Sequence, residues 1–131
     1  PTRVIDREQL RPRLGSLVLL DARAADRYSG EQHPVDPLGG HIPTARHAPT
    51  AGNLAPDGRF LPPDALAARY RALGVGEGET VASCGSGVTA CHDILAIVRA
   101  GLPEPMLYPG SWSDWCTSGL PYATGMEPGT A

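Results

Sequence analysis

Short apolar runs separated by glycine and proline recur along the chain, and the way each run ends indicates the element that it forms. Residues 16–21, Ser-Leu-Val-Leu-Leu-Asp, predict a buried strand that ends on a carboxylate. An unbroken apolar run of this length is typical of a parallel strand covered on both faces. Residues 79–84 and 105–108 predict two further short strands.

Helical spacing or a capping side chain marks three other segments. They are residues 4–14 with Asp6 as the N-cap, residues 62–73 with Asp64 as the cap and Gly74 as the stop, and residues 111–115 with Ser111 as the cap. Because these helices alternate with the strands, we expect an α/β domain with a largely parallel sheet.

A fourth helix is expected at residues 88–100, because apolar residues recur there at helical spacing before Gly101. The apolar face of this helix is predicted to consist of Val88, Cys91, Leu95 and Val98. On that face Cys91 is expected to pack in the core, since free cysteine often behaves as a small buried apolar residue.

Two regions lack such patterns. Residues 28–55 are rich in proline, glycine and histidine and predict a long loop with at most short elements. The tail after Tyr122 is rich in glycine and proline and is expected to be frayed.

Composition narrows the function classes. The 131 residues fit one domain, and a net charge of −3 without a basic run argues against a nucleic-acid surface. No stretch approaches the roughly 20 apolar residues of a membrane span. Three cysteines without a Cys-x-x-Cys pair argue against a disulfide framework or a metal site, and they favour reduced thiols in the cytoplasm. Because the chain starts at Pro1 without methionine, we expect a processed product or an excised domain.

The segment around Cys84 is the most informative about chemistry. A predicted strand ends at Cys84, the loop Gly85-Ser86-Gly87 follows, and a predicted helix opens. Loop glycines allow backbone N–H groups to turn inward, and a helix N-terminus adds partial positive charge. Such a cradle stabilises an anion, so it favours the thiolate of a cysteine, which is a nucleophile toward sulfur, phosphorus or arsenic centres.

The residue types in this loop separate those chemistries. Cysteine phosphatases place an arginine after five loop residues, where it clamps the phosphate, and here that position is Ala90. Without a bidentate cation, phosphatase or arsenate-reductase chemistry loses its main contact. A six-residue loop from Cys84 to Thr89 suits a smaller, sulfur-centred anion.

Four motifs in order carry a resemblance to a known family. They are 20–23 with 26–30 (Leu-Asp-Ala-Arg, Asp-Arg-Tyr-Ser-Gly), 40–43 (Gly-His-Ile-Pro), 84–89 (Cys-Gly-Ser-Gly-Val-Thr) and 108–115 (Tyr-Pro-Gly-Ser-Trp-Ser-Asp-Trp). The chain resembles the rhodanese superfamily, specifically the second, catalytic domain of two-domain thiosulfate/3-mercaptopyruvate sulfurtransferases. The resemblance implies a three-layer α/β fold with a mainly parallel central sheet flanked by helices. It also implies that residues 1–131 are a single catalytic domain, and that an N-terminal inactive rhodanese domain is missing from this chain.

The resemblance also implies roles for individual residues. Cys84 would accept a sulfane sulfur from thiosulfate or 3-mercaptopyruvate as a persulfide and pass it to cyanide or a thiol, without a cofactor. The expected substrate-binding residues are Arg27, which binds the anionic donor, and Gly85, Ser86, Gly87, Val88 and Thr89, whose amides hold the outer sulfur. The expected scaffold residues are Arg23, paired with Asp21 or nearby acids, His41, which braces a loop by hydrogen bonds, and Trp112 and Trp115, which pack the last helix.

The sequence departs from the family pattern at two places. Residues 44–47 (Thr-Ala-Arg-His) replace the usual Gly-Ala-x-Asn, so Arg46 is expected to add a cation near the cleft. A second rhodanese domain, a possible partner, covers the site in the family, so Cys84 is expected to be more exposed in this chain alone. Ser86 brings no charge where thiosulfate enzymes have a basic residue, which favours 3-mercaptopyruvate. The alternatives are a non-catalytic rhodanese-like binding or regulatory module and, less favoured because of Ala90, a cysteine phosphatase-like or arsenate reductase-like enzyme.

Overall fold

The computed structural model describes residues 2–131, and a parallel sheet forms its middle layer. The strands are β1 (Val18–Asp21), β2 (Arg46–His47), β3 (Thr80–Ser83) and β4 (Met106–Leu107), arranged in the order β2-β1-β3-β4. Every pairing in the sheet is parallel, so the carboxyl ends of all four strands lie along the same edge. The three predicted strands are therefore confirmed as β1, β3 and β4, with somewhat shorter bounds.

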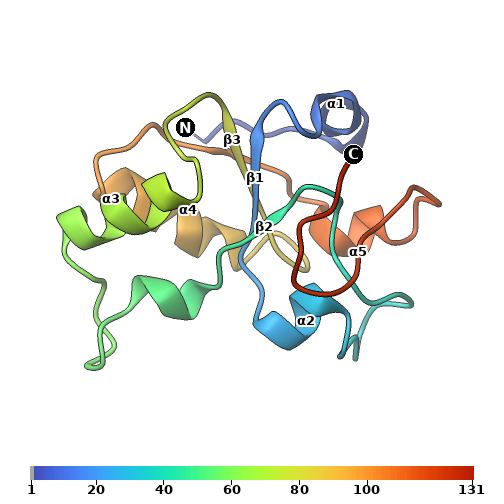
Figure 1. Ribbon diagram of the computed structural model, residues 1–131, viewed down its shortest axis with the longest axis horizontal. Coiled ribbons are helices and arrows are strands. Elements are labelled where there is room, and N and C mark those ends of the chain that lie inside the picture. Colours follow the sequence, from blue (N-terminus) through green and yellow to red (C-terminus); the bar gives the residue numbers. More distant parts are fainter. Residues whose placement is uncertain (1) are drawn as a thin grey trace.

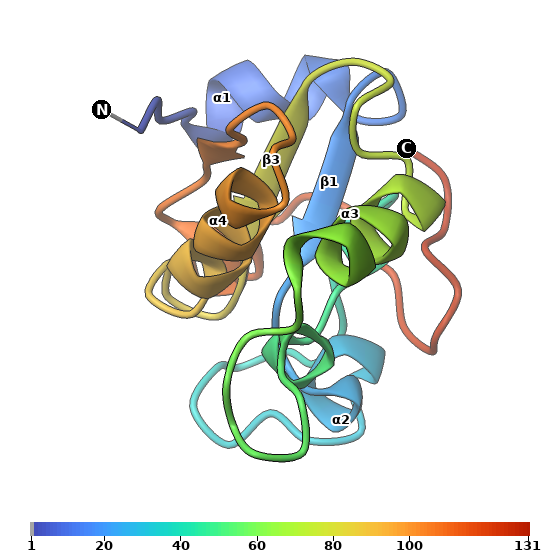
Figure 2. The same cartoon turned by 90° about the vertical axis from the view of Figure 1, so that its left-hand side faces the viewer.

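Helices cover both faces of this sheet and complete a three-layer α/β fold (Figure 1). The helices are α1 (Arg7–Leu10), α2 (Ala25–Ser29), α3 (Pro63–Ala72), α4 (Ala90–Arg99) and α5 (Ser111–Trp115), with short 3-10 helices at Arg11–Arg13 and Thr50–Asn53. α3 and α4 lie together on one face, whereas α1 and α5 lie on the other (Figures 1 and 2). α2 lies beyond the carboxyl end of β1 (Figure 1).

Alternation along β1 sends apolar side chains into both layers. Leu19 belongs to the buried cluster that includes Trp112 and Trp115, so the two tryptophans pack α5 onto the sheet as expected. Leu20, its neighbour, belongs to the opposite cluster with Leu66 of α3. This two-sided burial explains the unbroken apolar run that identified the strand.

The helix caps agree with the sequence only in part. Asp6 accepts the backbone N–H of Gln9 at 2.8 Å, and the Gln9 side chain accepts the N–H of Asp6 at 2.9 Å, which confirms Asp6 as the cap in a capping box. Asp64 was wrongly expected to cap α3, because Pro62 occupies that position and Pro63 opens the helix. Proline suits the first turn, where its missing N–H would have had no helical partner.

The face of α4 that packs against the rest of the protein is not the predicted one. The predicted apolar face is largely exposed, with Val88 at 76%, Leu95 at 56%, Val98 at 45% and Cys91 exposed. The buried side chains of α4 are Ala90, Asp93, Ile94, Ala96 and Ile97. Both faces carry apolar residues at helical spacing, and the carboxylate of Asp93 made the buried face look polar.

The tail after Tyr122 is largely exposed but is held by hydrogen bonds rather than frayed. Ala123 and His41 exchange two backbone hydrogen bonds, of 2.8 and 2.9 Å, and form an isolated bridge. The Pro128 carbonyl accepts the Thr44 N–H at 2.9 Å. The tail therefore closes over the 28–55 segment, which contains the short β2 strand and one 3-10 helix. Within residues 2–131 no helix is long and apolar enough to cross a membrane.

Candidate active site

Cys84 follows the last residue of β3 at the carboxyl edge of the sheet, where open α/β sheets place their sites. The N–H of Gly87 donates to Cys84 Sγ at 3.1 Å, so an amide of the loop already points at the sulfur. Gly87 has a φ of +93°, and a Cβ there would meet the Pro109 carbonyl oxygen at 2.5 Å, so only glycine fits. Cys84 is 1% exposed, which contradicts the expectation that it would be more open.

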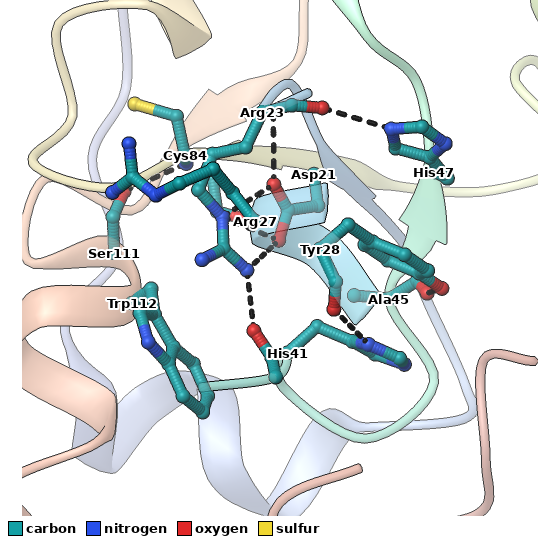
Figure 3. Close-up of polar contacts among 12 residues, drawn as sticks. Asp21, Arg23, Arg27, Tyr28, His41, Ala45, His47, Cys84, Ser111 and Trp112 are labelled. Carbon is teal, nitrogen blue, oxygen red and sulfur yellow. Dashed lines mark hydrogen bonds and ion pairs between the residues drawn. The ribbon is translucent and has the colours of Figure 1, made fainter. Parts of the chain in front are cut away.

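Helix α5 holds the backbone of the Cys84 loop, and sequence reasoning missed this. Ser111 Oγ accepts the N–H of Cys84 at 3.0 Å and donates to the Tyr108 carbonyl at 2.8 Å. The N–H groups of Trp112 and Ser113 donate to the carbonyls of Cys84 and Gly85 at 3.0 and 2.9 Å. Ser111 therefore does not cap α5 as expected, and its positive φ of 52° turns the chain so that its hydroxyl reaches the loop (Figure 3).

The Arg23 side chain is bound to other protein groups and has a structural role, as expected. Its Nε and a terminal nitrogen donate to the two carboxylate oxygens of Asp21 at 3.0 and 2.7 Å, and the same terminal nitrogen donates to the Gly40 carbonyl at 2.7 Å (Figure 3). Both side chains are buried. A paired and hydrogen-bonded ion pair of this kind fixes the turn after β1 and the loop at residue 40.

A pocket of about 360 Å³ opens beside the Cys84 loop. Its lining residues are Ala22, Arg23, Ala24, Arg27, Val35, Asp36, Thr50, Gly85, Ser86, Thr89 and Ser113. Arg27, on α2, has a terminal nitrogen only 3.2 Å from the position of a Cβ on Gly85, so its cation lies against the loop (Figure 3). Its side chain is 31% exposed, which leaves N–H donors available to an anion.

The structure brings together most of the predicted substrate-binding residues. Gly85, Ser86 and Thr89 line the pocket with Arg27, whereas Val88 does not line it and its side chain is largely exposed. A role for Val88 therefore depends on its backbone amide alone. The binding roles of all these residues stay predictions.

His41 and Arg46 both lie outside the pocket. His41 is fully buried, stacks on Tyr28 with ring centroids 3.8 Å apart, and places its Nδ1 2.8 Å from the Tyr28 carbonyl oxygen. It therefore braces the loop, as expected. Arg46 does not add a cation to the cleft: it does not line the pocket, and its guanidinium donates to the Leu73 carbonyl at the end of α3.

Sequence reasoning also missed Asp36 and Ser113, which line the pocket from the 28–55 loop and from α5. Ser113 Oγ donates to Asp36 Oδ1 at 2.8 Å. The two residues are 77 positions apart. Ser113 lay within the Gly-Ser-Trp motif, whereas no local pattern singled out Asp36.

A buried carboxyl lies in the first turn of α4, the helix that follows the Cys84 loop. Asp93 Oδ1 is 2.9 Å from Asn53 Nδ2, which donates to it, and 2.9 Å from the Tyr70 hydroxyl. Its Oδ2 is buried without a partner among the described residues. Burial raises the pKa of Asp93 to about 6, although the hydrogen bonds from Asn53 and Tyr70 work in the opposite direction.

Comparison with known protein families gives a match over most of the chain. A family model of the rhodanese-like domain matches residues 6–118. A Pseudomonas aeruginosa protein named "Probable 3-mercaptopyruvate sulfurtransferase" is 53% identical over 93% of this chain and 45% of its own length. The thiosulfate sulfurtransferase of Rattus norvegicus is 39% identical over 74% of this chain and 34% of its own. The chain thus spans less than half the length of these relatives.

Solved structures show the same arrangement of elements. The Tum1 protein from Saccharomyces cerevisiae superposes with a TM-score of 0.80 at 26% identity, over 95% of this chain and 47% of that one. The 3-mercaptopyruvate sulfurtransferase from Leishmania major gives a TM-score of 0.73 at 31% identity, over 88% of this chain and 33% of that one.

Proposed function

The chain belongs to the rhodanese-like domain family, and on that premise we propose that it is the catalytic domain of a sulfurtransferase that uses Cys84 as a persulfide-forming nucleophile. The observation that carries the proposal is the amide of Gly87, which donates to Cys84 Sγ at 3.1 Å beside a pocket lined by Arg27. An amide so placed stabilises negative charge on sulfur, first on the thiolate and then on the persulfide.

The proposed reaction has two halves, in which Cys84 first accepts a sulfur atom and then passes it on. The Cys84 thiolate attacks the outer sulfur of thiosulfate, the S–S bond of the donor breaks, and sulfite leaves with the bonding electron pair. With 3-mercaptopyruvate the C–S bond breaks, and the thiol proton ends on the carbon of pyruvate. Cyanide or a thiol then attacks the outer sulfur and releases the Cys84 thiolate, which gives ping-pong kinetics.

We also propose a preferred donor, a partner domain and a compartment. Ser86 lines the pocket without charge, which favours the monoanion 3-mercaptopyruvate over thiosulfate. Because the relatives are more than twice as long as the part that matches, we propose a second, inactive rhodanese domain as the partner of residues 1–131. Free thiols at Cys84, Cys91 and Cys116 suit a reducing compartment, for which we propose the cytoplasm.

The test is sulfur transfer by the full-length protein. Incubation with either donor followed by cyanide is expected to yield thiocyanate, and intact-mass analysis before cyanide is expected to show one added sulfur atom on Cys84. Cys84→Ser is expected to abolish both signals, whereas Cys91→Ser, at an exposed position of α4, is the matched control and keeps them. Absence of thiocyanate with both donors would refute the proposal and favour a non-catalytic binding module.

A further inference from the structure

The pocket contains a carboxylate that opposes the binding of anions. Asp36 is the acidic side chain among the described residues that line it, and this side chain is only 9% exposed. A sulfur donor carries at least one negative charge, so a fixed carboxylate in the same pocket repels it. Because the Asp36 side chain itself is largely shielded from solvent, its charge is screened less than that of a surface carboxylate.

Asp36 is held in the pocket rather than free to turn away. Ser113 Oγ donates to Asp36 Oδ1 at 2.8 Å, and the backbone N–H of Ser113 donates to the Gly85 carbonyl at 2.9 Å. One residue of α5 therefore connects the carboxylate to the Cys84 loop. Trp112 Nε1 donates to the Leu38 carbonyl at 3.0 Å, which fixes the same loop two residues further on.

The carboxylate also acts on the cation that is available to a donor. Arg23 is committed to Asp21 and to the Gly40 carbonyl, so among the described lining residues Arg27 is the arginine with unused donors. A terminal nitrogen of Arg27 lies 4.0 Å from Asp36 Oδ2, a loose ion pair that offsets the positive charge without satisfying the guanidinium. A donor therefore meets the N–H groups of Arg27 but little net positive charge.

We propose that Asp36 is a specificity-determining residue that selects against doubly charged sulfur donors in favour of singly charged ones. This inference rests on the proposed sulfurtransferase function and goes beyond it, because it assigns the discrimination to a residue outside the Cys84 loop. Electrostatic energy is proportional to the charge of the donor, so the factor by which Asp36 weakens a dianion is the square of the factor for a monoanion.

The test replaces Asp36 by asparagine, which keeps an acceptor for Ser113 and removes the charge. In the full-length protein, with cyanide as the acceptor, D36N is expected to lower the KM for 3-mercaptopyruvate by about threefold and that for thiosulfate by about tenfold. Added salt is expected to reduce both effects. Glu31→Gln, at an exposed position of the same loop, is the matched control and is expected to leave both KM values unchanged.

The KM measurements can also contradict the proposal. An unchanged ratio of the two KM values in D36N, or an equal loss of activity with both donors, would overturn the proposed role of Asp36. The sulfurtransferase function would still stand in that case, because the parent protein is active. An inactive parent protein would overturn both proposals. If D36N does not fold, Asp36→Ser removes the same charge and must shift the ratio in the same direction.

Discussion

The buried carboxyl of Asp93 is expected to make the stability of the fold depend on pH. The pKa of this group rises from the ordinary 3.8 to about 6 in the folded protein, because burial disfavours its charged form. The Tyr70 hydroxyl is 2.6 Å from Asn53 Oδ1 and 2.9 Å from Asp93 Oδ1, so its one proton serves two acceptors and offsets the effect of burial on Asp93 only in part.

The sign of the pH dependence follows from this shift. The folded state binds the Asp93 proton more tightly than the unfolded state does, so its contribution to stability is complete below about pH 4. That contribution is lost as the pH rises through about 6, the pKa in the folded state. A shift of about two pKa units corresponds to about 3 kcal/mol of unfolding free energy.

Asp93→Asn isolates this contribution, because asparagine has nearly the same shape and stays neutral. We expect the unfolding free energy of D93N minus that of the parent to rise by about 3 kcal/mol between pH 4 and pH 7. Urea unfolding at several pH values, with a reductant for the cysteines, measures this difference. Other carboxylates contribute equally to both proteins, so they cancel.

Glu77→Gln, at an exposed loop position, is the control and is expected to give a difference that hardly changes with pH. A flat difference for D93N, within about 0.5 kcal/mol across the range, would refute the argument that burial holds the proton. A difference that fell with rising pH would mean that the ionised carboxylate is the form that the fold prefers.

Three further substitutions test the site. Gly87→Ala is expected to displace the loop, because its Cβ would meet the Pro109 carbonyl oxygen at 2.5 Å. Iodoacetamide labelling of Cys84 is therefore expected to slow at least severalfold, and unchanged labelling would contradict this. Ser111→Ala leaves the Cys84 N–H without its acceptor and is expected to cost about 1–3 kcal/mol in urea unfolding. Arg27→Gln is expected to raise the KM for both donors, and more for thiosulfate, in the thiocyanate assay, whereas an equal rise would indicate lost packing alone.

The sheet was predictable because its information is local. A strand buried on both faces is typically an apolar run, and residues 16–21 supply one, whereas β3 is marked by Val81 and Ala82 between the small polar residues Thr80 and Ser83. The orientation of α4 was not predictable in this way, since apolar residues occupy both of its faces. The choice between the faces depends on Asn53 and Tyr70, which supply hydrogen bonds to Asp93 from distant parts of the chain.

The same distinction applies to the site. The Cys84 loop was recognisable because strand end, glycines and helix start are consecutive in the sequence. The hydrogen-bonded tail was not, because the tail contributes only backbone groups to its contacts with His41 and Thr44, and these leave no trace in its side-chain types. Ser111 was assigned to a cap for a related reason: its hydroxyl serves a residue 27 positions away.

The charged side chains at the pocket largely offset one another. Arg23 is neutralised by Asp21 and Arg27 is offset by Asp36, although of these two carboxylates only Asp36 is among the described residues that line the pocket. A Cys84 thiolate adds a further negative charge, and net attraction of an anionic donor is therefore weak. Under the proposed function, recognition of the donor would come instead from directed N–H groups, those of Arg27 and of the loop amides, which reward geometry more than charge.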